Sequence, residues 1–246
     1  MLETRSIKAL YPFALAEGEG VGTAYEYAAK RRVMKPLFEH VKAGSRVLVA
    51  GLPEKYGTSL DFVLAAVDAG ARVVAVDERQ AAIDRAKKAI AECMRAPDVT
   101  FVRVDSLDAV ARGEEFDVAL SCEVLQRVPA HGRRDFAHAL TRRAPRGVVF
   151  VPNSENPSHL EISGLGGFTK RGLADVLGAR DGDVGYLDMP PFPPGITRTT
   201  EQRGHASSGL LEAIAMRGLD VYCAAERVVP EALARKIAHI VWGRWG

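Results

Sequence analysis

The stretch Ser45–Asp77 constrains the fold more than any other, because it reads as a strand, a helix and a second strand in succession. Val47–Ala50 is a short apolar run, as expected of a parallel strand that is covered on both faces. In Thr58–Gly70 the apolar residues recur at helical spacing, and the final glycine suits a helix end. Arg72–Val76 is a second apolar run. The stretch therefore predicts one β-α-β unit.

Two residues of this unit indicate a nucleoside site. Gly51 follows the first expected strand, and Asp77 stands at the tip of the second. In such units, backbone N–H groups at the first turn face the polar end of a ligand, while a carboxylate at the second strand tip accepts hydrogen bonds from ribose hydroxyls. The alternative is an ordinary α/β core in which the turn holds no ligand and Asp77 is solvated.

The first turn, residues 51–57, departs from the glycine-rich dinucleotide pattern G-x-G-x-x-G. Its glycines are Gly51 and Gly57 alone. Pro53 has no N–H group to donate and favours an extended conformation at Leu52. A tight pyrophosphate cradle is therefore not expected, which lowers the weight of a dinucleotide ligand.

Length and composition favour one globular domain. The chain has 246 residues and a formal net charge of +2, and its basic residues are scattered, which leaves nucleic acid binding open without supporting it. Its three cysteines lack C-x-x-C spacing, so neither a disulfide framework nor a metal site is expected. The cysteine usage suits a reducing cytoplasm, where we expect the protein to reside. No apolar run approaches the roughly 18 residues of a membrane span, so no such span is expected.

The single domain is expected to have three parts. Residues 1–44 would form an N-terminal arm and a helix, residues 45–152 the ligand-binding core, and residues 153–246 a substrate-side insertion, a lid and closing strands. Residues 1–20 show weak periodicity and are expected to lie on the domain as an arm. The Pro-rich and polar stretch 189–208 is the predicted lid.

Beyond the first unit, strands and helices continue to alternate, which predicts a doubly wound, Rossmann-like parallel sheet with helices on both faces. Further strands are expected at Val99–Val104, Phe116–Ser121, Gly147–Val151, Val184–Asp188 and Ile237–Trp245. Further helices are expected at about Thr23–Val41, Arg79–Met94 and Gly132–Arg143.

Several motifs in this order resemble those of a known family. They are Asp77, Asp105-Ser106, the run F-D-V-A-L-S-C-E-V-L-Q-R-V-P at Phe116–Pro129, and G-G-F-T-K-R-G-L-A-D-V-L at Gly166–Leu177. Together they are similar to class I S-adenosylmethionine-dependent methyltransferases of the small-molecule and quinone-type subgroup, with a divergent first glycine loop. The resemblance implies a seven-stranded sheet, mostly parallel, with an antiparallel edge strand.

The resemblance also implies S-adenosyl-L-methionine as cofactor and assigns residues to it. Gly51 and Gly57 would flank the methionine part, Asp77 would bind the ribose hydroxyls, and Asp105 would meet the adenine. The implied cofactor-binding residues are Ala50, Gly51, Leu52, Lys55, Tyr56, Gly57, Asp77, Glu78, Asp105, Ser106, Leu107, Ser121, Cys122 and Glu123.

Other candidate site residues lie outside those motifs. Tyr25 or Arg31 is expected to cover the anionic end of the ligand, although both also suit a solvated helix face. His131, His159 and His205 are the imidazoles near expected loops, and any of them could act as the base if the acceptor is protonated.

The expected activity is methyl transfer to an oxygen or nitrogen atom of a small molecule. A protein that binds S-adenosylmethionine without turnover, or a regulatory one, is the main alternative because of the altered loop. An NAD-linked oxidoreductase is less favoured, since the sequence shows no recognisable hydride-transfer constellation.

Overall fold

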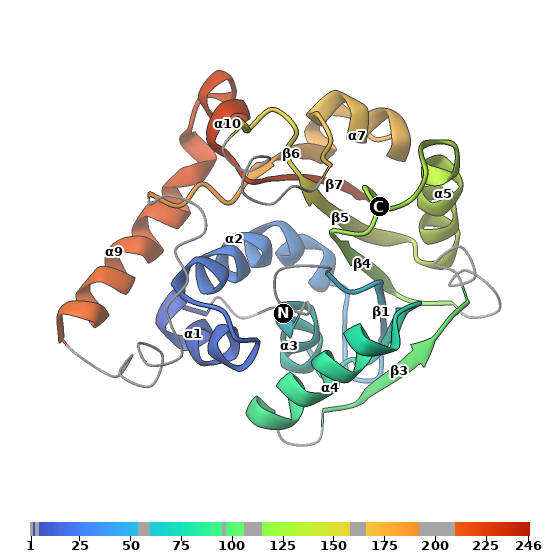
Figure 1. The fold of residues 1–246 in the computed structure, drawn as a ribbon, viewed down its shortest axis with the longest axis horizontal. Coiled ribbons are helices and arrows are strands. Elements are labelled where there is room, and N and C mark those ends of the chain that lie inside the picture. Colours follow the sequence, from blue (N-terminus) through green and yellow to red (C-terminus); the bar gives the residue numbers. More distant parts are fainter. Residues whose placement is uncertain are drawn as a thin grey trace.

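The computed structural model describes residue 2 and residues 5–53, 60–94, 97–105, 115–157, 166–191 and 210–246. Within these ranges the chain forms one seven-stranded sheet in the order β3-β2-β1-β4-β5-β7-β6 (Figure 1). The strands are β1 Arg46–Ala50, β2 Arg72–Asp77, β3 Val99–Arg103, β4 Val118–Cys122, β5 Arg146–Pro152, β6 Val184–Leu187 and β7 Ile240–Trp245.

Helices follow most of the strands. The α-helices are α1 Ile7–Ala16, α2 Val21–Phe38, α3 Leu60–Asp68, α4 Gln80–Cys93, α5 Arg133–Arg143, α7 Lys170–Leu177, α9 Leu210–Ala225 and α10 Glu231–Ile237. Short 3-10 helices are η2 Ala130–Gly132, η3 Asp181–Asp183 and η4 Glu226–Val228.

The sheet confirms the predicted architecture. Strands β1 to β5 pair in parallel, and β7 pairs antiparallel with both β5 and β6. The antiparallel strand is thus not the edge itself, because it lies between β5 and β6. The strand order reverses at β1, which leaves the carboxyl ends of β1 and β4 side by side, the usual position for a ligand in such sheets.

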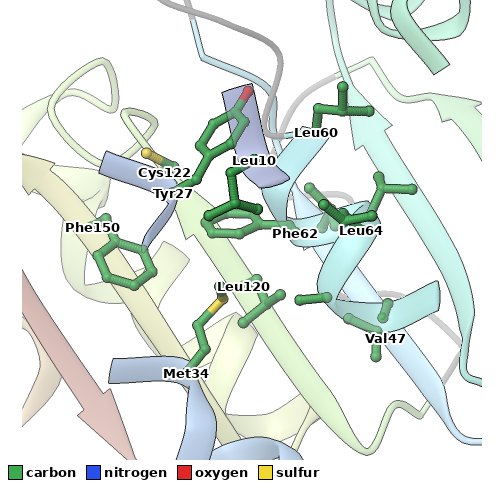
Figure 2. Packing of buried hydrophobic residues seen from close by; sticks show 14 of the residues in the cluster. Leu10, Tyr27, Met34, Val47, Leu60, Phe62, Leu64, Leu120, Cys122 and Phe150 are labelled. Atoms are coloured by element: carbon green, nitrogen blue, oxygen red, sulfur yellow. The ribbon is translucent and has the colours of Figure 1, made fainter. Parts of the chain in front are cut away.

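Alternate residues of the central strands pack on opposite faces of the sheet. Val47 and Val49 belong to a core shared with α1, α2, α3 and α4, whereas Leu48 and Ala50 belong to one shared with α5 and α7. Figure 2 shows the first core, where Phe62 and Phe150 lie beside the aliphatic residues. Burial on both faces explains why these strands read as continuous apolar runs.

The expectation of an N-terminal arm is wrong, because α1 is a helix packed against α2. Its Ile7, Leu10, Tyr11 and Ala14 are buried at helical spacing. The side chain of Ser6 caps its first turn. The segment is apolar on almost every side, so its sequence shows no clear period.

Among the helices that the structure describes, none is long and apolar enough to cross a membrane. The same residues contain no group of three or more His, Cys, Asp or Glu side chains placed to hold a metal ion.

Candidate functional site

The turn after β1 requires a glycine. Gly51 has a φ of 81°, in the left-handed region, and its N–H donates to the carbonyl of Val76 at 2.8 Å. A Cβ atom at this position would lie 2.5 Å from Cγ2 of Val124, which follows β4. The backbone of β1 therefore turns tightly against the segment that leaves β4.

Asp77 lies at the tip of β2, as predicted, but it does not face an empty cleft. The side chain is fully buried. Its carboxylate accepts hydrogen bonds from the backbone N–H of Leu52 at 2.7 Å and of Arg79 at 2.8 Å. It also accepts from Nε and Nη2 of Arg79 at 2.9 and 3.0 Å. These contacts tie the tip of β2 to the first loop.

Arg79 extends this link to the loop itself. Its Nη2 donates to the carbonyl oxygen of Leu52 at 2.6 Å and lies 3.4 Å from that of Pro53. Arg127 adds a second cation, with Nη2 3.7 Å from Oδ2 of Asp77. Burial alone would raise the pKa of Asp77, but the hydrogen bonds from Arg79 and Leu52 outweigh it and lower that pKa below its ordinary value.

The segment at the end of β4 completes this part of the site. Ser121 donates its hydroxyl to the carbonyl of Ala50 at 2.9 Å, and Cys122 is buried, which raises the pKa of its thiol. Glu123 has a φ of 54° and is buried, with its N–H bonded to the carbonyl of Phe150. Gly51, Asp77 and Ser121–Glu123 therefore meet at one edge of the sheet.

Several predicted site residues are not part of this group. Lys55, Tyr56, Gly57, Ser106, Leu107, His159 and His205 lie outside the described residues, as does most of the predicted lid. Asp105 is exposed after β3, Glu78 is half-buried beside Asp77, and His131 is exposed on η2.

Arg31 does not reach the ligand edge. Its Nη2 lies 2.9 Å from Oδ2 of Asp68, the last residue of α3, and the arginine is buried there. Helix α3 starts at the carboxyl edge of β1 and runs back along the sheet, so Asp68 lies toward the opposite edge. The expectation that Arg31 covers an anionic ligand is therefore not supported by its position.

Tyr25 is buried rather than lying on a solvated face. Its hydroxyl donates to Oε1 of Glu226 at 2.6 Å, a contact that joins α2 to η4. Burial and the neighbouring Glu226 raise the pKa of Tyr25 above its ordinary value. Tyr25 thus joins α2 to the C-terminal third of the chain.

A second group of buried charges, missed by the sequence reading, centres on Lys30 of α2. Its Nζ lies 2.5 Å from Oε1 of Glu26 and 3.7 Å from Oδ2 of Asp61. The ammonium group also lies over the rings of Phe62 and Phe150 in cation–π contacts. Burial raises the pKa of Asp61 to about 6 despite the nearby Lys30. Glu26 and Lys30 are four residues apart, a spacing that is also typical of exposed ion pairs on a helix surface. The spacing alone therefore did not indicate that this pair is buried.

No family model and no curated protein matches this sequence. Solved structures do match the fold. One is a protein from Galdieria sulphuraria provisionally assigned as a sarcosine dimethylglycine methyltransferase, with 11% identity and a TM-score of 0.53 over 92% of this chain and 84% of that chain. Another is an S-adenosylmethionine-dependent methyltransferase from Archaeoglobus fulgidus, with 12% identity and a TM-score of 0.53 over 89% and 93% of the two chains.

The chain has the class I methyltransferase fold. In this fold, the candidate site of the present chain occupies the carboxyl edge of β1, β2 and β4, where parallel sheets bind ligands. The sequence-based prediction placed Gly51, Asp77 and Ser121–Glu123 at this edge, where the structure brings them together. It missed Arg79 and Arg127, although Arg79 stands only two residues after Asp77.

Proposed function

We propose that this chain is an S-adenosylmethionine-dependent methyltransferase that acts on a small molecule. The observation that supports it most is the meeting of the Gly51 turn, the Asp77 carboxylate and Ser121–Glu123 at one edge of a methyltransferase-type sheet. Backbone from two strands and a carboxylate from a third thereby meet where one nucleoside would lie.

The groups present fit the cofactor after one exchange of partners. Arg79 donates to both carboxylate oxygens of Asp77, and a ribose diol offers two O–H donors that can replace it. The Arg79 side chain is 28% exposed, so the guanidinium can turn toward solvent. Bound S-adenosylmethionine would supply an electrophilic methyl group, while Asp77 and the Gly51 turn would hold its nucleoside and methionine ends.

The remaining task of the protein is to bring an acceptor to that methyl group and exclude water. Proximity and orientation alone can lower such a barrier by about 7–11 kcal/mol. Helix α2 would form one wall of the acceptor site, with its buried Tyr25 and Lys30 on the inner side.

One observation favours a second candidate, a protein that keeps the fold without turnover. The four hydrogen bonds to Asp77 use the acceptor positions that a ribose needs. If the Arg79 side chain never leaves the Asp77 carboxylate, the ribose of a nucleoside finds no free acceptor there.

Calorimetric titration and turnover separate these candidates. Wild-type protein is titrated with S-adenosylmethionine, S-adenosylhomocysteine, NAD and NADP, and formation of S-adenosylhomocysteine is then followed with catechol, benzoic acid and sarcosine. Sarcosine is included because the name of the Galdieria neighbour refers to it. Binding of the first two ligands with turnover of one acceptor supports the proposal. Binding without turnover supports the second candidate, and binding of NAD or of no ligand overturns the proposal.

A further inference from the structure

His239 and Asp188 face each other just beyond the antiparallel pair of β6 and β7. The register of these strands ends at Leu187 opposite Ile240. One position further, the N–H of His239 donates to the carbonyl of Asp188 at 2.9 Å, and Nδ1 of His239 lies 3.1 Å from Oδ2 of Asp188. Backbone and side chains therefore fix the two residues to each other.

This pair lies on the same edge of the sheet as the candidate cofactor site. The carbonyl of His239 accepts from the N–H of Asn153, the residue after β5, at 2.9 Å. Strand β5 runs parallel to β4, so its end and Asn153 are at the carboxyl edge. In the sheet order β4-β5-β7, which Figure 1 shows, His239 is two strand spacings from the end of β4, about 10 Å. The attacking atom of a small acceptor would have to lie within that width, in contact with both the imidazole and the methyl group.

The backbone of Asp188 is held in a conformation that few residues adopt. Its φ is 64°, in the left-handed region, which aspartate tolerates better than most residues but at a cost of about 1 kcal/mol. The carboxylate is buried, and within the described part of the chain Oδ1 has no hydrogen-bond partner. The imidazole of His239 is thus the main polar contact of the Asp188 carboxylate. That contact is made through Nδ1 and sets the orientation of the ring.

Two further carboxylates, those of Glu226 and Glu26, raise the pKa values of this pair. Glu226 is satisfied by three donors, the hydroxyl of Tyr25 at 2.6 Å, the N–H of Met189 at 2.6 Å and Nη2 of Arg32 at 2.8 Å. The charge of Glu26 on α2 also raises the pKa of both Asp188 and His239.

These surroundings raise the proton affinity of both members of the pair. Burial raises the pKa of Asp188 to about 6, although His239 opposes the rise. Burial alone would lower the pKa of His239, but Asp188, Glu26 and Glu226 together raise it above its ordinary value. The imidazole can therefore serve as a proton acceptor once the pH exceeds that raised pKa.

The imidazole is also the member of the pair that a bound molecule can touch. Its side chain is 15% exposed, against 7% for Asp188. Of the histidines that the sequence reading selected, His131 is exposed on η2, and no described contact holds its ring.

We propose that His239, oriented by the positioning residue Asp188, accepts the proton of the methyl acceptor. This rests on the proposed function. The O–H or N–H bond of the acceptor breaks, and its proton passes to Nε2 of His239. The freed electron pair forms the bond to the methyl carbon, and the carbon–sulfur bond breaks with its pair kept by sulfur. The acceptor class is accordingly a hydroxyl or amine compound that must lose a proton on methylation.

The experiment compares His239→Gln and Asp188→Asn with wild type, and His138→Gln, at an exposed histidine of α5, is the matched control. Turnover is followed with the better acceptor of catechol and sarcosine, from pH 5.5 to 9.5. Calorimetry with S-adenosylhomocysteine shows whether each variant keeps its fold and cofactor site.

For His239→Gln we expect kcat to fall by about 10²–10⁴-fold, with S-adenosylhomocysteine affinity within about twofold of wild type. The rise of kcat with pH should disappear. In Asp188→Asn that rise should move to lower pH, because the carboxylate raises the pKa of the imidazole. His138→Gln should match wild type.

Two outcomes overturn the proposal in distinguishable ways. Wild-type turnover that His239→Gln retains, with the same pH profile, removes the proton-accepting role and leaves the methyltransferase function standing. Wild-type protein that forms no S-adenosylhomocysteine with any acceptor removes both. A variant that loses S-adenosylhomocysteine binding together with turnover marks His239 as a structural residue, which also overturns the proposal.

Discussion

Arg79 donates to both carboxylate oxygens of Asp77, from Nε at 2.9 Å and from Nη2 at 3.0 Å. These two N–H donors occupy the carboxylate oxygens to which a ribose diol would donate. Any ligand with such a diol must therefore displace the guanidinium, and the free energy of that displacement is lost from its affinity.

We predict that Arg79→Gln tightens the binding of S-adenosylhomocysteine. The ion pair is part-exposed on the arginine side, so its free energy is small, and we expect a gain in affinity of about two- to fivefold in calorimetric titrations. Arg85→Gln is the matched control, because it removes the same charge from an exposed position on α4. Weaker binding by Arg79→Gln would instead mean that Arg79 contacts the ligand.

Asp77→Asn should destabilise the apo protein as well as weaken ligand binding. The buried carboxylate joins Arg79 and Leu52, and charged hydrogen bonds of this kind contribute about 1–3 kcal/mol to the free energy of unfolding. S-adenosylhomocysteine affinity should fall at least tenfold. Urea unfolding and calorimetry measure the two effects, and unchanged stability would contradict the buried link.

The same variant gives a pH test. The hydrogen bonds of Asp77 lower its pKa in the folded state, so its contribution to stability is complete above the unfolded value of about 3.9. That contribution is lost as the pH falls through the lower folded value. The difference in unfolding free energy between wild type and Asp77→Asn should therefore be constant near pH 7 and shrink below about pH 4.

The sequence was sufficient to predict the sheet, because buried parallel strands and amphipathic helices leave different periods. Strands β1 and β2 and helix α4 lie close to where the apolar patterns placed them. Helix α1 was missed because apolar residues occupy nearly all its sides, so burial there depends on α2 rather than on a visible stripe.

The site was predicted less fully, because many of its polar side chains pair with residues that are far away in the sequence. Gly51 and Asp77 follow directly from strand ends. The partners of Tyr25 and His239 do not, because 201 residues separate Tyr25 from Glu226 and 51 separate His239 from Asp188. Only the folded chain shows which charge each polar side chain meets.

Gly51→Ala should lower stability through both backbone strain and a steric clash. A φ of 81° costs an alanine about 1–3 kcal/mol, and the new Cβ would lie 2.5 Å from Cγ2 of Val124. Gly218→Ala is the control, because nothing lies within 4 Å of a Cβ on this residue of α9. We expect thermal melts to show a clear loss for the first and no loss for the second.

Asp61→Asn is predicted to stabilise the protein at neutral pH. Asp61 is fully buried in the first turn of α3, and within the described residues neither carboxylate oxygen has a hydrogen-bond partner. Lys30, at 3.7 Å, compensates the charge only in part. Burial consequently raises its pKa to about 6, with Glu26 and Glu17 adding to the rise.

A carboxyl group whose pKa is raised on folding favours the folded state most when it is protonated. The contribution of Asp61 is therefore complete below its unfolded pKa of about 3.9 and is lost as the pH rises through about 6. Relative to Asp61→Asn, the wild-type free energy of unfolding should fall between pH 4 and pH 7 by about 1–3 kcal/mol. Urea unfolding of both proteins at pH 4, 5, 6 and 7 measures this, with Asp175→Asn, an exposed aspartate of α7, as the control. A difference between wild type and Asp61→Asn that stays constant across this range would show that Asp61 is ionised in the folded protein throughout.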